Sequence, residues 1–388
     1  MSGYLTEEYL QLQQMARKFT EQEIIPIADQ IDEQEAEIPE EILKKMGELG
    51  FFGIMFPEEY GGAGLDALAV AVVTEELSRG MLSVGSVAAR NLITGLELVR
   101  YGTEDQKKRF VPGMATGEIQ TATAGTEPEA GSDAANIKTI AKKVGNKYIL
   151  NGSKVFTTFA NRANVLFVYA KTDPDAKPKH RGISCFLIEK EPGEQFAPPH
   201  LTGNRIKTIG YHGMNTYTLF FENLEVPEEN LLGGIEGKGF YQLMGGYEIA
   251  RIQFAFRSIG VARAAYERAL QYSRERVQFD QPIAKFQAMR FRLAEMATEI
   301  EAARQLGYYA ADKHRRGERC DLEAGMAKLL ASEIALKHTW GALQMHGGYG
   351  YTREYPVQRY WRDAGLLPIG EGTTEIQKEI IARRLLGE

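Results

Sequence analysis

The hydrophobic pattern of this chain changes twice along its length, and these two changes limit its fold more than any other feature. Up to residue 118, apolar residues recur at helical spacing, as in TEEYLQLQQMARKF. Short runs rich in Tyr, Phe, Val and Ile then follow as far as residue 230, separated by turn residues. The pattern predicts an N-terminal helical domain at 1–118, a middle β domain at 119–230 and a C-terminal helical domain at 231–388.

Together the three regions predict an α+β fold. Five or more short strands in the middle region favour a small β-barrel or sandwich. The last region contains three long helical segments with short connections, which favour an up-and-down arrangement like a four-helix bundle. Because 44% of the 388 residues are hydrophobic, such a chain can bury large cores without disulfides.

Charge and cysteine content argue against several partners and compartments. The net charge of −6 disfavours a nucleic acid, because phosphate binding needs a basic surface. The two cysteines, Cys185 and Cys320, lie far apart and indicate a reducing compartment. The first residues contain no long apolar run, so we expect neither a secretory signal nor a membrane span. We therefore expect a cytoplasmic protein.

The sequence lacks the motifs of several common enzyme classes. No G-x-G-x-x-G follows a strand, and GGIEGKGF contains Gly237 and Lys238 but not the Ser or Thr of a P-loop. The six histidines do not have the spacing of metal ligands, so we expect no metal site. A nucleophile elbow is also missing. These observations argue against Rossmann dehydrogenases, P-loop enzymes, zinc enzymes and α/β-hydrolases.

Three polar, glycine-rich stretches are candidate ligand sites. ATAGTEPEAGSDAANIKT offers hydroxyl and backbone N–H groups to an anionic or carbonyl-rich ligand. RERVQFDQPIAKFQ combines a cation, amides and an aromatic ring, as a phosphate-linked aromatic cofactor would require. QMHGGYGYTREYP has glycines that allow a ligand to come close to the backbone. Taken singly, each stretch is better explained by a structural role, as a β-turn, a bundle connection or a helix C-cap.

Six stretches occur in the order in which one known family has them: TEPEAGSD, NGSKVFTTFAN, FENLEVPEENLLGGIEGKGF, RVQFDQPIAKFQ, QMHGGYGY and GEGTTEIQ. In these stretches the chain resembles the flavin-dependent acyl-CoA dehydrogenases, over nearly its whole length. The domain order of that family, helical then β then helical, agrees with the hydrophobic pattern described above.

The resemblance implies FAD as cofactor. In the family TEPEAGSD lies against the flavin and the acyl-CoA, and FTTF packs on the isoalloxazine ring. The C-terminal stretches hold the diphosphate and adenosine side, partly from a neighbouring subunit. This chain has Phe156 where the family usually has Trp, and Asp280 where it usually has Gly. The residues expected at FAD are Thr126, Ser132, Phe156, Thr158, Arg276, Phe279, Gln287, Gln344, Gly348, Thr373 and Glu375.

The resemblance also implies a substrate site and a catalytic base. Ser132, Tyr247 and Arg251 are expected to line the bound acyl-CoA. Glu371, in GEGTTEIQ, matches the base that removes the α-proton of the thioester. Some branches of the family carry the base just before the arginine of the long helix, where this chain has Ala250.

A helix is expected to begin directly after the base. Thr374 and Gln377 have capping-box spacing, which predicts a helix N-terminus beside Glu371. In the family the N–H of the base and a flavin ribityl hydroxyl together hold the thioester oxygen. Gly370 and Gly372 allow the backbone to approach it.

The function that the resemblance implies is oxidation of an acyl-CoA to a 2,3-enoyl-CoA. The electrons would pass through FAD to an electron-transfer flavoprotein, and the protein would be a homotetramer. Two alternatives stay open from the sequence. One is an oxidase of the same fold that uses oxygen, and the other is a helical binding or assembly protein that has kept the fold without the chemistry.

Two further positions bear on the substrate. Gly370 stands where the family usually has Tyr, which predicts a bulky, branched, cyclic or aromatic acyl group. Alignment on RYG places Arg90 and Asn91 on the helix that lines the acyl end. An inward-facing Arg90 would pair with a second carboxylate, as in glutaryl- or benzylsuccinyl-type thioesters. A role of both residues at the helix surface is equally open.

Overall fold

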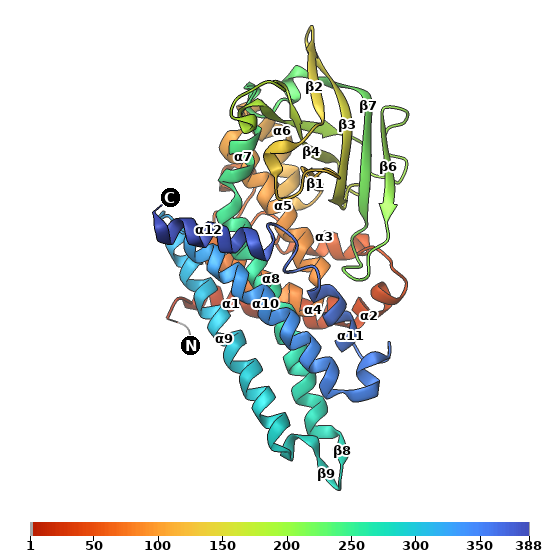
Figure 1. Ribbon diagram of the computed structural model, residues 1–388, viewed down its shortest axis with the longest axis vertical. Coiled ribbons are helices and arrows are strands. Elements are labelled where there is room, and N and C mark those ends of the chain that lie inside the picture. The colour runs from red at the N-terminus through yellow and green to blue at the C-terminus, as the bar shows by residue number, and fades with distance from the viewer. Residues whose placement is uncertain (1–2, 388) are drawn as a thin grey trace.

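Helices form both ends of the chain and strands its middle part, which confirms the predicted fold class (Figure 1). The computed structural model describes residues 3–387. The change from helix to strand lies between Thr116 and Thr121, and α-helix returns at Gly239. No helix of the described residues is long and apolar enough to cross a membrane.

The first domain is built around helices α4 and α5. Every residue of α4 is buried, and the helix packs against α5, α1 and α8. The carboxylate of Asp66 caps α4 by accepting hydrogen bonds from the N–H groups of Leu68, at 2.9 Å, and Ala69, at 3.2 Å. The helices of this domain are α1 (Glu7–Phe19), α2 (Ile25–Glu33), α3 (Glu40–Glu48), α4 (Ala67–Gly80), α5 (Leu82–Tyr101) and α6 (Glu104–Thr116).

The middle domain is one curled sheet of seven strands in the described part of the chain (Figure 1). Its order is β1-β4-β2-β3-β7-β6, with β5 on the other edge of β4. Most neighbours are antiparallel, but β4 runs parallel to β1 and β2. The sheet has its own hydrophobic core. The strands are β1 (Thr121–Ala124), β2 (Ile140–Val144), β3 (Lys147–Thr158), β4 (Val165–Lys171), β5 (Ile183–Glu189), β6 (Leu201–Ile206) and β7 (Thr216–Pro227).

Three long helices dominate the last domain, and they extend away from the sheet (Figure 1). Helices α8 and α10 pack closely along their lengths, and α9 packs against both. The shorter α11 and α12 lie across α10. The helices are α7 (Gly239–Gly245), α8 (Tyr247–Glu275), α9 (Gln287–Arg315), α10 (Asp321–Met345), α11 (Val357–Ala364) and α12 (Thr374–Leu386).

A β-hairpin that the sequence pattern did not predict joins α8 to α9. Its strands are β8 (Val277–Gln278) and β9 (Gln281–Pro282). The two turn residues, Phe279 and Asp280, have φ angles of 51° and 60°. Positive φ at both central residues is what a two-residue hairpin turn of the right twist requires. The hairpin forms the lower tip of the molecule in Figure 1.

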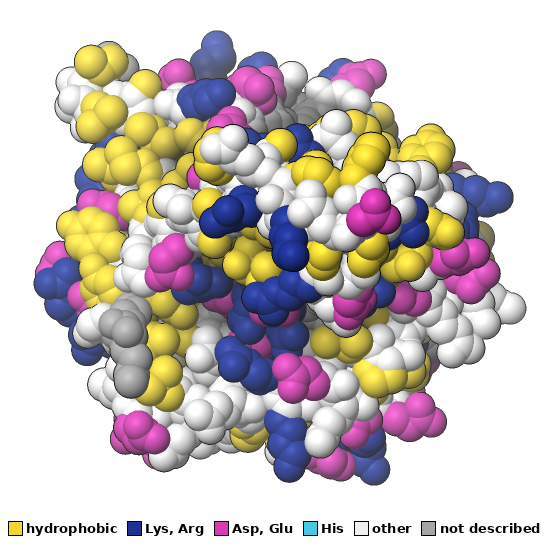
Figure 2. All heavy atoms as spheres, turned by 90° about the horizontal axis from the view of Figure 1, so that it is seen from below, with side chains coloured by type: hydrophobic (Ala, Val, Ile, Leu, Met, Phe, Trp, Pro, Cys, Tyr) yellow, Lys and Arg dark blue, Asp and Glu magenta, His cyan; other side chains and the backbone are white. Residues whose placement is uncertain are grey.

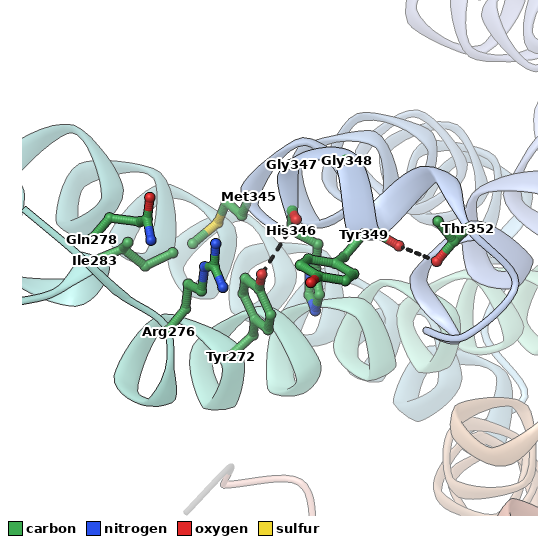
Figure 3. A pocket seen from close by; sticks show the side chains of 10 residues that line it. All are labelled: Tyr272, Arg276, Gln278, Ile283, Met345, His346, Gly347, Gly348, Tyr349 and Thr352. Carbon is green, nitrogen blue, oxygen red and sulfur yellow. Dashed lines mark hydrogen bonds between the residues drawn. The ribbon is translucent and has the colours of Figure 1, made fainter.

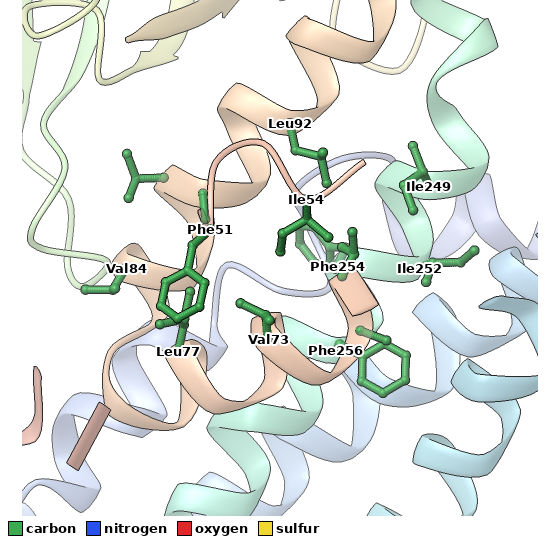
Figure 4. Packing of buried hydrophobic residues seen from close by; sticks show 14 of the residues in the cluster. Phe51, Ile54, Val73, Leu77, Val84, Leu92, Ile249, Ile252, Phe254 and Phe256 are labelled. Atoms are coloured by element: carbon green, nitrogen blue, oxygen red, sulfur yellow. The ribbon is translucent and has the colours of Figure 1, made fainter. Parts of the chain in front are cut away.

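One hydrophobic core joins the first and last domains. Figure 4 shows side chains of α4 and α5, such as Val73 and Leu92, packed with Ile249, Ile252 and Phe254 of α8. This shared core fixes α5 beside the first turns of α8. Polar side chains on those two helices can therefore meet.

Candidate active site

Glu371 lies in the loop between α11 and α12, in a left-handed backbone conformation. Its φ is 51°, and that of the following Gly372 is 91°. Helix α12 begins two residues further on, and the Thr373 hydroxyl caps it by accepting a hydrogen bond from the Ile376 N–H at 3.3 Å. The expectation of a helix start beside Glu371 is correct, but the capping residue is Thr373 and not Thr374, one residue earlier than the spacing predicted.

The Glu371 carboxylate points at α8. Its Oε1 accepts a hydrogen bond from Nη2 of Arg257 at 2.5 Å, and its Oε2 accepts one from Nε2 of Gln253 at 2.9 Å. The Glu371 side chain is 34% exposed, whereas that of Arg257 is only 4% exposed. The carboxylate thus reaches from a surface loop to a buried cation.

Arg257 has contacts with three elements. Its Nη1 donates a hydrogen bond to Oγ of Ser86 on α5 at 2.7 Å, and its guanidinium lies 4.2 Å from the centre of the Phe254 ring. Its Nε is buried and has no hydrogen-bond partner in the described part of the protein, and the same holds for Oε1 of Gln253. Buried polar atoms normally have partners, so two such atoms beside one carboxylate indicate a ligand site.

Lys328 of α10 adds a second buried cation. Its Nζ donates a hydrogen bond to the carbonyl oxygen of Gly372 at 2.7 Å and lies 5.0 Å from the centre of the Phe254 ring. Burial lowers the pKa of Lys328 to about 8, although nearby Glu371 acts in the opposite direction. Lys328 therefore tethers the loop that carries Glu371.

Tyr247 and Arg251, which the sequence assigns to the substrate, lie together at the start of α8. The guanidinium of Arg251 is 5.3 Å from the centre of the Tyr247 ring. Burial lowers the pKa of Arg251 and raises that of Tyr247 to about 12. Nε of Arg251 is buried and lacks a hydrogen-bond partner among residues 3–387.

The space next to Gly370 is occupied on one side by an aromatic ring. A Cβ atom added at Gly370 would lie 3.4 Å from the ring of Phe254. The space left by the missing Tyr side chain at Gly370 therefore borders on the ring of Phe254, which was not expected from the sequence.

Arg90 and Asn91 behave differently from each other. Asn91 is buried, and its amide joins α5 to the start of the sheet: Nδ2 donates to the Ile119 carbonyl at 2.9 Å, and Oδ1 accepts from the N–H and hydroxyl of Thr121. Because both ends of the amide are engaged, we do not assign Asn91 to the substrate. Arg90 is half-buried, and its buried Nε has no partner within the described chain.

The residues expected at the flavin ring lie at one end of the sheet. Phe156 is 64% exposed and has a φ of 57°, so its ring is presented outward from the end of β3. Thr158, two residues on, is buried and shares a hydrogen bond of 3.0 Å with the Thr216 hydroxyl. Thr126 and Ser132 are exposed on the neighbouring loop, whose Thr126 carbonyl accepts a hydrogen bond from Val155.

The residues expected at the adenosine side lie at the far end of α8. A cavity of about 470 Å³ opens there, lined by Arg276, Gly347 and Gly348 among others (Figure 3). Arg276 projects from the end of α8 toward the segment that carries Met345 and Gly347, as Figure 3 shows. Gln344, near the end of α10, and Gln287, at the start of α9, are both exposed. Oε1 of Gln344 accepts a hydrogen bond from Arg292.

These features fit a dinucleotide cofactor. A Cβ at Gly347, Gly348 or Gly131 would meet no heavy atom of the described residues within 4 Å, so a ligand can reach the backbone there. Nε2 of His346 is buried without a partner in this part of the structure. The ring surface at Phe156 and the cavity at Arg276 belong to different domains. Phe279, at the hairpin tip, is 87% exposed.

The end of the molecule that carries the hairpin is a mixed surface. Figure 2, which views the molecule from below Figure 1, shows Lys and Arg side chains gathered near the centre and hydrophobic side chains reaching the surface beside them. Exposed hydrophobic groups next to cations suit an interface that also contacts an anionic group.

Several residues of the site were missed in the sequence: Ser86, Gln253, Phe254, Arg257 and Lys328. Gln253, Phe254 and Arg257 follow Ala250 at three, four and seven residues along α8, so they share its helix face. Because Ala250 marks the alternative base position, this periodicity would have identified three of the five residues. No such signal exists for Ser86 and Lys328, which come from other helices.

Three family models match this chain. They are the N-terminal, middle and C-terminal domains of acyl-CoA dehydrogenases, and they match residues 6–118, 122–224 and 237–386. Proteins of this family are flavoproteins.

Relatives of known name agree with these models. The chain is 44% identical to an acyl-CoA dehydrogenase of Bacillus subtilis, over 99% of both chains. It is also 44% identical to the (2S)-methylsuccinyl-CoA dehydrogenase of Cereibacter sphaeroides, over 98% of this chain and 70% of that one. A chain from a structure of the electron transferring flavoprotein of Acidaminococcus fermentans superposes with a TM-score of 0.94 and 40% identity, over all of both chains. This protein therefore belongs to the acyl-CoA dehydrogenase family.

Proposed function

We propose that the protein is an FAD-dependent acyl-CoA dehydrogenase in which Glu371 is the catalytic base. Glu371 takes the α-proton of the thioester, and FAD, when bound, would supply the acceptor for the β-hydrogen, which leaves as a hydride. The C2–C3 bond becomes a double bond, and the product is a 2,3-enoyl-CoA. The observation that carries this proposal is the Glu371 carboxylate itself, which reaches from the loop before α12 into a site with unpartnered buried polar atoms.

The surrounding residues suit the removal of a weakly acidic proton. Enolate charge develops on the thioester oxygen, and the Glu371 N–H is proposed as one of its two donors. One such donor lowers the barrier by about 3 kcal/mol. The nearby cations Arg251 and Lys328 add positive potential where this charge appears. Ser132, Tyr247 and Arg251 are proposed to line the bound acyl-CoA.

The proposed FAD site has two parts. Thr126, Ser132, Phe156 and Thr158, together with Thr373 and Glu375 at the start of α12, are proposed to contact the flavin. Arg276, Phe279, Gln287, Gln344 and Gly348 are proposed to hold the diphosphate and adenosine. Because the exposed hairpin carries Phe279 away from its own subunit, we propose that it reaches a neighbour within a homotetramer.

The electron acceptor is proposed to be an electron-transfer flavoprotein. The support is the structural match to a chain from an electron transferring flavoprotein structure. The acyl group is proposed to be bulky, branched, cyclic, aromatic or dicarboxylic, as expected from the sequence. A screen of such thioesters for bleaching of the flavin absorbance would separate these classes.

The decisive experiment is the Glu371→Gln variant. Glutamine has nearly the same size and keeps a hydrogen-bonding group, so FAD content and affinity for acyl-CoA should persist. It cannot take the α-proton, and anaerobic flavin bleaching should slow by roughly 10²- to 10⁴-fold. Bleaching at the parent rate would show that Glu371 is not the base.

Two outcomes with the unaltered protein would point to the alternatives. Rapid peroxide formation from oxygen during turnover would indicate an oxidase. A colourless protein that binds no FAD when the cofactor is added would indicate a binding member of the fold without chemistry.

A further inference from the structure

The base is held in an ion pair that opposes its reaction. Arg257 and Gln253 engage both carboxylate oxygens of Glu371 and draw them toward α8. A guanidinium in contact with the carboxylate neutralises the charge with which it must attract the α-proton. Glu371 can therefore remove the proton more easily when another acceptor is hydrogen-bonded to Arg257 in its place.

The site contains more buried positive charge than negative charge. Arg257 and Lys328 are buried at 3% and 0% exposure, and Arg251 lies on the same helix as Arg257 at 9%. Two of these cations, Arg257 and Lys328, lie over the Phe254 ring. Within the described chain, the only carboxylate hydrogen-bonded to either of them is that of Glu371. Buried cations require an anionic partner, so the site can accept a second negative charge.

The unpartnered polar atoms lie at the same place. Nε of Arg257 is a buried donor without a hydrogen-bond partner among the described residues, and the Ser86 hydroxyl accepts from the other side of the same guanidinium. Nε and Nη2 form one edge of the planar guanidinium, and once Glu371 has left Nη2 this edge matches a carboxylate in two parallel hydrogen bonds. Lysine or an amide could not offer this geometry.

From these three observations we propose that Arg257 binds a second carboxylate on the acyl group, and that the substrates are short dicarboxylic acyl-CoA thioesters. The inference rests on the proposed function and names its substrate class. On binding, the substrate carboxylate replaces Glu371 at the guanidinium. Glu371 is thereby released toward the α-carbon.

Distances limit the length of the acyl group. The α-carbon must lie next to Glu371, and Arg257 is already in contact with Glu371. In a four-carbon acyl group two C–C bonds of about 1.5 Å each separate the α-carbon from the distal carboxyl carbon. The guanidinium can reach that carboxylate at about 2.7–2.9 Å. Succinyl- and glutaryl-type groups therefore fit, with or without a branch, whereas long acyl chains gain nothing from Arg257.

Binding without turnover tests the proposal first. FAD-loaded Glu371→Gln protein and the double variant Glu371→Gln/Arg257→Met are titrated by calorimetry with matched pairs: butanoyl-CoA and succinyl-CoA, and pentanoyl-CoA and glutaryl-CoA. We expect the Arg257 change to raise the Kd of the dicarboxylic thioesters roughly 10- to 100-fold. The Kd of the monocarboxylic thioesters should change less than about 3-fold.

Flavin bleaching then tests the release of the base. In Arg257→Met protein that retains Glu371, bleaching by the dicarboxylic thioesters should slow, while bleaching by the monocarboxylic ones should hold or quicken. Arg257→Lys keeps the charge without the planar fork, and it should also lose selectivity for the dicarboxylic member of each pair.

Matched controls make each outcome decisive. Arg263→Met removes a half-buried, ion-paired arginine of α8 and should leave the ratio of the two substrate classes unchanged. Equal losses for both classes in Arg257→Met would reduce Arg257 to a positioning residue of Glu371 and overturn the proposal. So would a selective loss in Arg90→Met but not in Arg257→Met. If no thioester bleaches the parent flavin, the proposed function itself fails, which is a separate result.

Discussion

Helix α8 contributes to two groups of buried charges about two helical turns apart, and they are built differently. The first, here called the α4 ion cluster, consists of Glu75 and Glu76 of α4 with Arg17, Arg79, Arg263 and Arg304. The second, the Glu371 group, consists of Glu371, Gln253, Arg257, Ser86 and Lys328.

The α4 ion cluster is complete. Glu75 accepts hydrogen bonds from Nε and Nη2 of Arg304, both at 3.0 Å, and Glu76 is bonded to Arg17, Arg79 and Arg263. No side chain of this cluster has a buried polar atom without a partner in residues 3–387, whereas the Glu371 group has two. Full pairing indicates a structural joint between domains, and incomplete pairing indicates a site built to be opened by a ligand.

The largest effect should follow from breaking the complete group. Glu76→Ala removes a fully buried carboxylate that three guanidiniums share, and we expect a loss of about 3–5 kcal/mol in the free energy of unfolding. Urea denaturation measures it. The matched control is Glu267→Ala, because Glu267 also pairs with Arg79 and Arg263 but is 42% exposed, and its loss should be at most about 1 kcal/mol. Equal losses would remove the distinction between a buried joint and its rim.

A third arrangement sharpens the comparison, because Glu97 has a neutral partner instead of a cation. The Tyr169 hydroxyl lies 2.7 and 2.9 Å from its two oxygens, and burial raises the pKa of Glu97 from 4.5 to about 7. The folded state therefore binds this proton more tightly than the unfolded state. The contribution of Glu97 is complete below about pH 4.5 and is lost as the pH rises toward 7.

Glutamine cannot ionise, so the Glu97→Gln variant should not lose stability in this way as the pH rises. The difference in free energy of unfolding, variant minus parent, should increase between pH 5 and pH 8 by up to about 3 kcal/mol. Urea denaturation at the two pH values measures the change, and Glu33→Gln, at an exposed carboxylate, serves as control. A relative stability that does not vary with pH would show that Glu97 is ionised in the folded protein.

The order of the domains and most helices could be predicted because hydrophobic periodicity is local. The hairpin at 277–282 could not, since its turn consists of Phe279 and Asp280 and not of the glycines that usually mark such turns. Thr373 and Thr374 are neighbours with the same hydroxyl, so spacing alone could not choose the capping residue.

The active site was predictable only in part. Glu371 was singled out by its motif and stays a prediction, and the structure places it beside buried cations. In the sequence Arg257 cannot be told from other charged residues of a long helix. Its partners, Ser86 of α5 and Glu371 of the loop before α12, come close to it only in the folded protein. Asn91 shows the reverse problem: its place on α5 was anticipated, but its partners are backbone groups of Ile119 and Thr121 and the Thr121 hydroxyl.

Removing Asn91 should have an intermediate effect on stability and none on substrate choice. Asn91→Ala leaves buried groups of Ile119 and Thr121 without partners, which should cost about 1–3 kcal/mol. Thermal unfolding measures it, with Asn204→Ala at an exposed position of β6 as control. A changed preference among acyl-CoA thioesters, with unchanged stability, would return Asn91 to the substrate site.

The smallest effect on stability is expected at the Glu371 group. Arg257→Met removes a buried cation with an unpartnered Nε, and the half-exposed Glu371 can turn to water. We expect a change of less than about 1 kcal/mol in the free energy of unfolding, or a gain. A loss as large as that of Glu76→Ala, measured in the same urea titration, would show that both groups are structural joints.

The left-handed backbone of Glu371 has an evolutionary consequence. A glycine at this position would adopt the same φ without the steric cost of about 1–2 kcal/mol that a side chain imposes there. Selection for folding alone would therefore favour glycine at this position, and the protein would gain stability as it lost the carboxylate proposed to be the base. Under the proposed function, the Glu371 side chain serves turnover at a cost in folding stability.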